Sequence, residues 1–143
     1  FCSRLANGKA PIIFEDGLQT RDFIHISDVV RANIAAMTHP APPHSVVNVG
    51  TGRGTSILGV AQALGRAMGV DIQPEVVKRF REGDIRHCYA DNSRLKALGV
   101  TPQVRFEEEG VRKLMEWVMA QSVPADGVDG ACRELEERGL IKG

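Results

Sequence analysis

One stretch of the sequence decides how the fold of the rest of the chain is interpreted: Gly17-Leu-Gln-Thr-Arg-Asp-Phe-Ile-His-Ile-Ser-Asp28. Gly17 predicts a turn. A short buried strand is expected next, because aromatic and β-branched residues follow at Phe23, Ile24 and Ile26. Ser27 or Asp28 then offers a side-chain oxygen that can cap a helix. The stretch therefore predicts a turn, a strand and a helix start, in that order.

Arg21 lies beside this predicted strand. A guanidinium held at the mouth of a strand is suited to phosphate, because its planar fork matches two oxygens at once. The neighbouring Asp22 offers an alternative, in which the two side chains form a surface ion pair and bind no ligand. The stretch alone leaves both interpretations open.

Strands and helices alternate outward from this stretch, which indicates an α/β protein. Short apolar runs predict strands at Pro11-Ile-Ile-Phe14 and at residues 46–49. A helix over residues 28–38 is expected to bury Val29, Ala32, Ile34, Ala36 and Met37. Further helices are predicted at residues 55–68, ended by Gly69, at 107–121, and at 128–138 as a charged surface helix.

Length and composition restrict the class of protein. With 143 residues, the chain can form one domain with a core, and its 18 basic and 18 acidic residues give no net charge. This balance argues against a general binder of nucleic acid or of membrane surfaces. Three separated cysteines predict a reduced, cytoplasmic protein, and neither a membrane span nor a leader is visible. Because the chain begins at Phe1, we expect the N-terminal part of a longer protein to be absent.

A glycine-rich turn, Gly50-Thr-Gly-Arg-Gly54, follows the predicted strand at residues 46–49. The dinucleotide-binding fingerprint requires glycine at its first, third and sixth positions, but the sixth residue counted from Gly50 is Thr55. We therefore favour a tight strand-to-helix turn over a cofactor site, and assign no cofactor-binding residue to this chain.

Cations gather in a second polar stretch, at residues 78–91, although the whole chain is neutral. Gly83 allows the backbone to turn between Arg81 and Asp84, so this loop offers a guanidinium to a phosphate and a carboxylate to a ribose diol. A solvated loop held by internal ion pairs is the alternative. If Arg21 and Arg81 meet in the folded chain, they clamp a diphosphate from two sides.

Four motifs occur in a characteristic order: Phe-Glu-Asp-Gly-x-Gln-x-Arg-Asp-Phe-Ile-His-Ile-x-Asp (14–28), Val-Asn-Val-Gly-Thr-Gly (47–52), Arg-x-Gly-Asp-Ile-Arg-His (81–87) and Ala-Asp-x-Ser-Arg (90–94). Together they resemble the C-terminal portion of the NAD-dependent nucleotide-sugar epimerases and dehydratases, the extended short-chain dehydrogenases. The resemblance reaches about residue 120. The terminal sequence from Asp129 to Leu140 is similar to the dTDP-L-rhamnose 4-epimerase-like subgroup.

The resemblance implies a fold and a set of substrate contacts. The fold is a small mixed α/β substrate lobe, joined by the late strand (46–49) and helix of a Rossmann-type dinucleotide-binding sheet. In that family Arg21 and Arg81 would contact the diphosphate of a UDP- or dTDP-sugar, and Asp84 would reach the ribose. Ile12 and Phe14 would lie along the base.

The resemblance also implies what other parts of the parent enzyme supply. The family's chemistry requires NAD and a tyrosine followed four residues later by lysine, whereas Tyr89 is followed at that distance by Ser93. We therefore expect no catalytic residue in this chain, no cofactor bound by it alone, and no activity without the missing N-terminal Rossmann portion. The parent is expected to be a homodimer. His87 and Cys88 lack a third ligand for a metal.

Two parts of the chain are expected: residues 1–121 as the sugar-nucleotide-binding portion, and residues 122–143 as a charged C-terminal helix and tail. An apolar surface is expected to face the missing half. A stand-alone nucleotide-binding module without catalytic function, or a structural α/β domain, remains the alternative.

Overall fold

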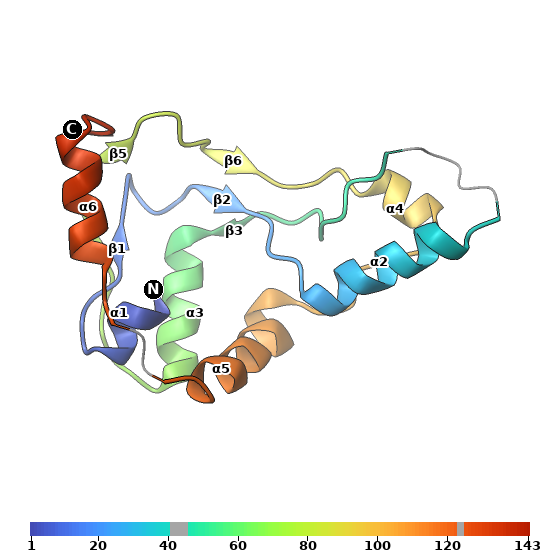
Figure 1. Ribbon diagram of the computed structural model, residues 1–143, viewed down its shortest axis with the longest axis horizontal. Helices are drawn as coiled ribbons and strands as arrows, with labels where there is room; N and C mark the ends of the chain where they lie inside the picture. The colour runs from blue at the N-terminus through green and yellow to red at the C-terminus, as the bar shows by residue number, and fades with distance from the viewer. Residues whose placement is uncertain (41–45, 123–124) are drawn as a thin grey trace.

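The computed structural model describes residues 1–40, 46–122 and 125–143, so two residues of the predicted C-terminal segment, 123–124, lie outside the described residues. Helices and short strands are interspersed along the chain (Figure 1), which confirms the α/β class. The helices are α1 (Cys2–Ala6), α2 (Ile26–Thr38), α3 (Ile57–Met68), α4 (Ser93–Ala97), α5 (Val111–Met119), which continues a π-helical turn η1 (Phe106–Gly110), and α6 (Val128–Glu137). The strands are β1 (Ile12–Ile13), β2 (Thr20–Arg21), β3 (Thr55–Ser56), β4 (Glu75–Val76), β5 (Phe80–Arg81), β6 (His87–Cys88) and β7 (Ile141–Lys142).

Among the described residues, three small sheets connect segments that are distant in sequence. β1 pairs in parallel with β4. β2 lies between β3, to which it is antiparallel, and β6, to which it is parallel, with Thr20 opposite both Ser56 and His87. β5 pairs antiparallel with β7, so the end of the chain returns to Arg81. These pairings fix the positions of the segments that carry Arg21 and Arg81.

The main core lies where α3 packs against α1 and α5. Its buried side chains are apolar and come from all three helices: Leu5, Val60, Ala63, Leu64, Val111 and Met115. The side chain of Ser56 accepts a hydrogen bond from the Gly59 N–H at the start of α3, and Gly69 ends the helix at a positive φ of 67°. Glycine adopts this left-handed conformation without steric cost, so the predicted end of the helix is confirmed.

The strand predicted over Phe23, Ile24 and Ile26 is wrong. Only Thr20 and Arg21 form a ladder, and the chain then continues without strand pairing to α2. Phe23 stacks on Phe106 with ring centroids 4.6 Å apart, so an aromatic contact takes the place of the expected strand packing. The predicted capping residue is also wrong, since α2 begins at Ile26 and the His25 ring accepts a hydrogen bond from the Ser27 N–H.

The apolar face predicted for α2 is mostly exposed. Of the five residues expected inside, Ala32 alone is fully buried, whereas Met37 is 85% exposed and Ile34 is 55% exposed. Ile26 and Val30 extend this exposed face with the i, i+4, i+8 spacing of one side of a helix. α2 lies at one end of the molecule, packed on α4 through Ala32 and Leu95 (Figure 1). Its other side therefore has no layer to cover it among the described residues.

The strand predicted at residues 46–49 forms no ladder within the described part of the chain. Val47 and Val49 pack against the cluster of Ala32, Leu95 and Val100. An extended segment becomes a strand only when a neighbour supplies backbone hydrogen bonds, and the described residues offer none here. Among those residues there is also no helix of sufficient length and hydrophobicity to cross a membrane.

Candidate functional site

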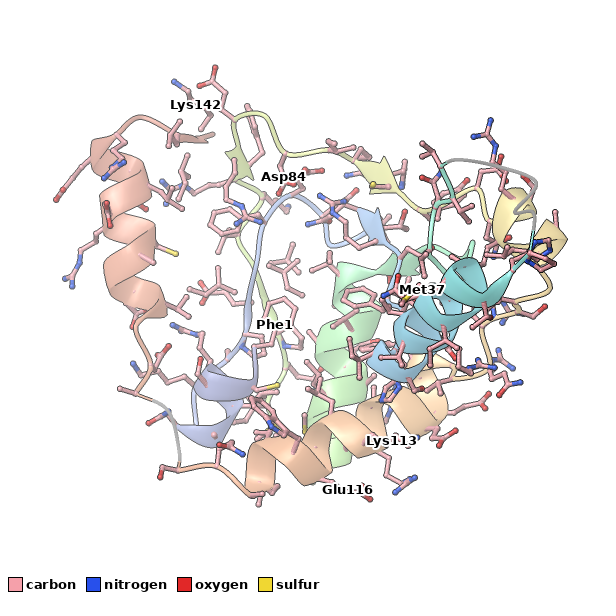
Figure 2. All side chains as sticks on the ribbon, turned by 45° about the vertical axis from the view of Figure 1, so that its right-hand side comes forward. Phe1, Met37, Asp84, Lys113, Glu116 and Lys142 are labelled. Carbon is pink, nitrogen blue, oxygen red and sulfur yellow. The ribbon has the colours of Figure 1, made fainter. Side chains whose placement is uncertain are left out.

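A cavity of about 390 Å³ collects all five side chains predicted to bind substrate: Ile12, Phe14, Arg21, Arg81 and Asp84. These residues come from β1 and the residue after it, from β2, and from β5 and the loop after it. In sequence Arg21 and Arg81 are far apart, yet the fold brings them to one site. Figure 2 labels Asp84 and Phe1, which both line this cavity beside α6.

Asp84 joins the two arginines. Its Oδ1 accepts a hydrogen bond from Arg21 Nη2 at 2.5 Å, and its Oδ2 accepts one from Arg81 Nη2 at 3.0 Å. Gly83 has a φ of +80°, and the Asp84 N–H donates to the Arg81 carbonyl at 3.1 Å, so the predicted turn brings the carboxylate back towards Arg81. Two guanidinium groups share one carboxylate, which leaves one positive charge at this site. Such a site favours an anion.

Each arginine is held by its surroundings. Arg21 Nη1 donates to the Thr20 carbonyl at 2.8 Å, and the strand that carries Arg21 is paired on both sides. Arg81 lies in β5, which β7 flanks, and its guanidinium lies 5.2 Å from the centroid of the Phe14 ring. The side chains of Arg21 and Asp84 remain 28% and 24% exposed. The pair is therefore accessible to a ligand that enters the cavity.

Asp22 does not pair with Arg21, so the alternative of a surface ion pair between these two residues is wrong. Successive residues of an extended chain point to opposite sides, and the Asp22 carboxylate faces the glycine turn. It accepts hydrogen bonds from the N–H groups of Thr51, Gly52 and Ala90 at 2.9 to 3.1 Å. Burial raises the pKa of Asp22, but these hydrogen bonds and the one from the Thr51 hydroxyl outweigh burial and hold the pKa below its usual value.

The glycine turn is shaped around this carboxylate. A Cβ atom at Gly50 would lie 2.5 Å from the Cβ of Ala90 and 2.7 Å from Asp22 Oδ2, so no other residue fits without a shift of the backbone. The N–H groups of Thr51 and Gly52 are directed at Asp22. In the structure, therefore, the turn packs against a side chain of the chain itself, in agreement with the predicted structural role.

The other cations of the charged loop do not line the cavity. Arg86 pairs with Glu15 at 2.6 Å and with Asp16 at 2.7 Å, and these hydrogen bonds lower the pKa of Asp16 to about 2. Arg79 pairs with Glu136 of α6 at 2.7 Å. Internal ion pairs therefore hold Arg79 and Arg86 outside the cavity, whereas Arg81, which also pairs within the loop, with Asp84, lines the predicted site.

Besides Phe1, Arg4 and Ile57, two further groups of cavity residues were not predicted from the sequence. Gln19, 5% exposed, donates from Nε2 to the Phe14 carbonyl at 2.9 Å and so fixes the backbone beside a predicted base contact. The second group lies on α6: Val128, Ala131, Cys132 and Leu135. Their i, i+3, i+4, i+7 spacing is visible in the sequence and marks one face of a helix, although the helix as a whole is strongly charged.

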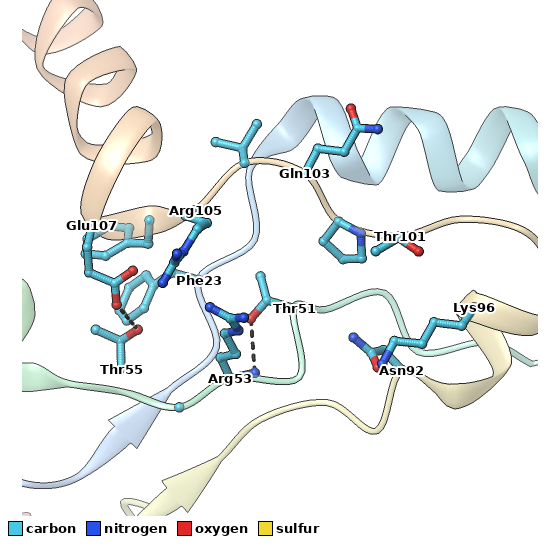
Figure 3. A pocket seen from close by; sticks show the side chains of 14 residues that line it. Phe23, Thr51, Arg53, Thr55, Asn92, Lys96, Thr101, Gln103, Arg105 and Glu107 are labelled. Atoms are coloured by element: carbon cyan, nitrogen blue, oxygen red, sulfur yellow. Dashed lines mark hydrogen bonds between the residues drawn. The ribbon is translucent and has the colours of Figure 1, made fainter.

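A larger cavity, of about 450 Å³, is lined in part by the glycine turn (Figure 3). Its rim carries Arg53, Lys96 and Arg105, all exposed. The Thr55 hydroxyl donates to Glu107 at 3.0 Å across one end, and the cavity contains none of the residues predicted to bind substrate. The cavity with Arg21 and Arg81 is therefore the candidate site. No group of three or more His, Cys, Asp or Glu residues suited to a metal ion occurs among the described residues.

Comparison with known proteins finds relatives of this chain. A model of the NAD dependent epimerase/dehydratase family matches residues 1–50. The dTDP-L-rhamnose 4-epimerase of Burkholderia thailandensis is 39% identical to this chain over 118 residues, which cover 81% of the chain and 32% of that relative.

Two solved structures match the fold. The UDP-N-acetylglucosamine 4-epimerase from Methanobrevibacter ruminantium, in complex with UDP-N-acetylmuramic acid, has a TM-score of 0.76 and 30% identity, over 85% of this chain and 38% of that one. A mutant UDP-glucuronic acid 4-epimerase from Bacillus cereus, in complex with UDP-4-deoxy-4-fluoro-glucuronic acid and NAD, has a TM-score of 0.73 and 27% identity, over 82% and 38%. The chain thus spans about a third of the length of the relatives that it matches.

Proposed function

Since the chain belongs to the NAD-dependent epimerase/dehydratase family, we propose that residues 1–121 are the sugar-nucleotide-binding portion of an enzyme that acts on a UDP- or dTDP-sugar. The observation that carries the proposal is the meeting of Arg21 and Arg81 at Asp84 in one cavity. A nucleotide-sugar offers a diphosphate to the two guanidinium groups. The names of the relatives, which are epimerases of UDP- and dTDP-sugars, agree with this ligand class.

Each residue has a separate task in this proposal. Arg21 and Arg81 hold the diphosphate oxygens through charge-assisted hydrogen bonds. Each oxygen of Asp84 can accept more than one hydrogen bond, so the carboxylate can bind ribose hydroxyls while it stays close to both arginines. Ile12 and Phe14 provide apolar surface for the base.

The chemical step is assigned to residues beyond these 143. Tyr89 is 58% exposed, lies outside the candidate cavity, and is followed four residues later by Ser93 instead of lysine. The glycine turn does not fit the pyrophosphate of NAD, because the N–H groups of Thr51 and Gly52 are directed at Asp22. NAD and the proton-abstracting pair accordingly belong to the remainder of the parent enzyme. This chain contributes substrate binding.

The remainder of the parent enzyme would cover the exposed end of this chain. The exposed face of α2, with Ile26, Val30, Ile34 and Met37, is an apolar stripe on one side of a helix. Residues 46–49 lie beside α2 and have no strand partner among the described residues. A Rossmann-type portion would provide a neighbouring strand for residues 46–49 and a packing surface for α2. It would also account for the observation that this chain spans about a third of the length of its relatives.

Calorimetric titration with UDP and dTDP tests the proposal. Arg21→Ala and Arg81→Ala should each weaken binding by about 1.5–3 kcal/mol, because each removes a charged hydrogen-bond donor from the diphosphate. Arg53→Ala is the matched control, since Arg53 is exposed and lies on the other cavity. Absence of binding by the unaltered chain, or equal losses in all three variants, would show that the chain is instead a structural domain.

A further inference from the structure

Helix α6 presents its apolar side to the candidate cavity. Val128, Ala131, Cys132 and Leu135 occupy one face of the helix, and all four line the cavity. No residue of α6 is fully buried, so this face is not packed into the core. It therefore forms a wall of the cavity and remains accessible to a ligand.

The helix is attached to the rest of the molecule at both ends. Near its start, Asp129 pairs with Arg4 of α1 at 2.5 Å and Asp126 pairs with Lys9 at 2.9 Å. Near its end, Glu136 pairs with Arg79 at 2.7 Å, and β7 pairs with β5. Figure 1 shows α6 at the same end of the molecule as β1, and the two elements line one cavity. These contacts fix the distance between the helix and the strand that carries Ile12.

The cavity has a polar part and an apolar part. Arg21, Arg81 and Asp84 supply the charges of the polar part, and the fourth charged residue of the lining, Arg4, is paired with Asp129 of α6. Ile12 and Phe14, together with the α6 face, are apolar. If the diphosphate of a ligand contacts the two arginines, the group attached to that diphosphate therefore lies against the apolar walls. A planar base, apolar on both faces, suits that position.

We propose that α6 covers the nucleoside end of the bound substrate, so that the C-terminal segment helps to select the base. This inference rests on the proposed function, which supplies the diphosphate. The cavity volume of about 390 Å³ lies near the small end of the range for ligand pockets, roughly 300–1,000 Å³. In this arrangement a single-ring base lies between β1 and α6, and the larger purine is disfavoured.

Thiol alkylation tests the inference directly, because Cys132 lines the cavity whereas Cys2 and Cys88 do not. UDP at ten times its Kd should slow iodoacetamide modification of Cys132 roughly tenfold, since only the unoccupied protein reacts. Peptide mass spectrometry then follows each cysteine separately. The rate at Cys88, which is exposed, should stay constant, and ADP at the same concentration should protect Cys132 less.

A matched pair of substitutions provides a second measurement. Ala131→Trp places a bulky side chain in the cavity and should weaken UDP binding at least tenfold, whereas Arg133→Trp lies outside the cavity and should change it less than twofold. Circular dichroism confirms that both variants fold. If the unaltered chain binds neither UDP nor dTDP, the proposed function fails. If it binds UDP but Cys132 stays reactive and Ala131→Trp binds normally, the role of α6 is wrong and the proposed function stands.

Discussion

In the glycine turn, residues 50–54, the N–H groups of Thr51 and Gly52 donate to Asp22, whereas in the charged loop the side chains of Arg81 and Asp84 line a cavity. By composition the glycine turn resembles a site for a nucleotide, and the charged loop resembles a solvated surface. The structure assigns them differently. The glycines allow the backbone to pack closely around the Asp22 carboxylate. The charged loop supplies Asp84, which pairs with Arg21. The difference teaches that a polar group is available to a ligand only where it lines an accessible cavity. The N–H groups of Thr51 and Gly52 are satisfied by Asp22, whereas the paired side chains of Arg21 and Asp84 line a cavity and stay partly exposed.

Substitution of two aspartates, Asp22 and Asp84, tests this comparison. Loss of Asp22 should have the larger effect on the free energy of unfolding. Asp22→Ala leaves three backbone N–H groups without their acceptor. We expect a loss of roughly 3–5 kcal/mol in the free energy of unfolding, because each unsatisfied donor costs about 1–3 kcal/mol and some are reached by water. Urea unfolding followed by circular dichroism measures it. Asp84→Ala is the control and should lose less than about 1 kcal/mol, the usual value of an exposed ion pair. Equal stability of the two variants would mean that the glycine turn does not depend on Asp22.

Asp84 should instead affect binding, by a smaller amount. Asp84→Ala should weaken UDP binding by about 1–2 kcal/mol, because it removes a charged acceptor for the ribose hydroxyls. Inorganic pyrophosphate, which has no ribose, should bind this variant at least as tightly as the unaltered chain, since both arginines are then free of their internal partner. Calorimetry with both ligands provides the comparison. Loss of affinity for pyrophosphate would indicate that Asp84 serves only to position the arginines.

Signals within a short stretch of sequence predict individual helices. Motifs that lie far apart in the sequence predict the candidate site. The spacing of apolar residues and Gly69 suffice for α3, because both signals lie within the helix. The meeting of Arg21 and Arg81 was expected from their motifs, and the cavity contains both.

Predictions that depend on distant packing were less successful. Phe23 was assigned to a strand because its stacking partner, Phe106, is more than eighty residues away. The sequence of α6 predicts a surface helix, because the apolar residues that face the cavity are few among many charges. The expected face of α2 was wrong because only one side of that helix has neighbours among the described residues.

The smallest expected effect is on thermal stability, and it concerns the ion pairs of the charged loop outside the cavity, in which Arg86 contacts Glu15 and Asp16. Hydrogen bonds from Arg86, and then from the Leu18 N–H, lower the pKa of Asp16 from 3.8 to about 2. A carboxyl whose pKa is lowered on folding stabilises the folded chain above its unfolded pKa, so this contribution is lost as the pH falls from about 4 to about 2. The difference in melting temperature between the unaltered chain and Asp16→Asn should therefore be visible at pH 6 and vanish near pH 2. A difference that is the same at both pH values would contradict the pairing with Arg86.

The convergence of two arginines on one diphosphate is tested most directly by a crystal structure of the chain with UDP. The account predicts diphosphate oxygens about 3 Å from the guanidinium nitrogens of both Arg21 and Arg81, the distance of a charged hydrogen bond. A diphosphate bound instead in the cavity of Arg53 and Arg105, or in contact with only one of the two predicted arginines, would contradict it.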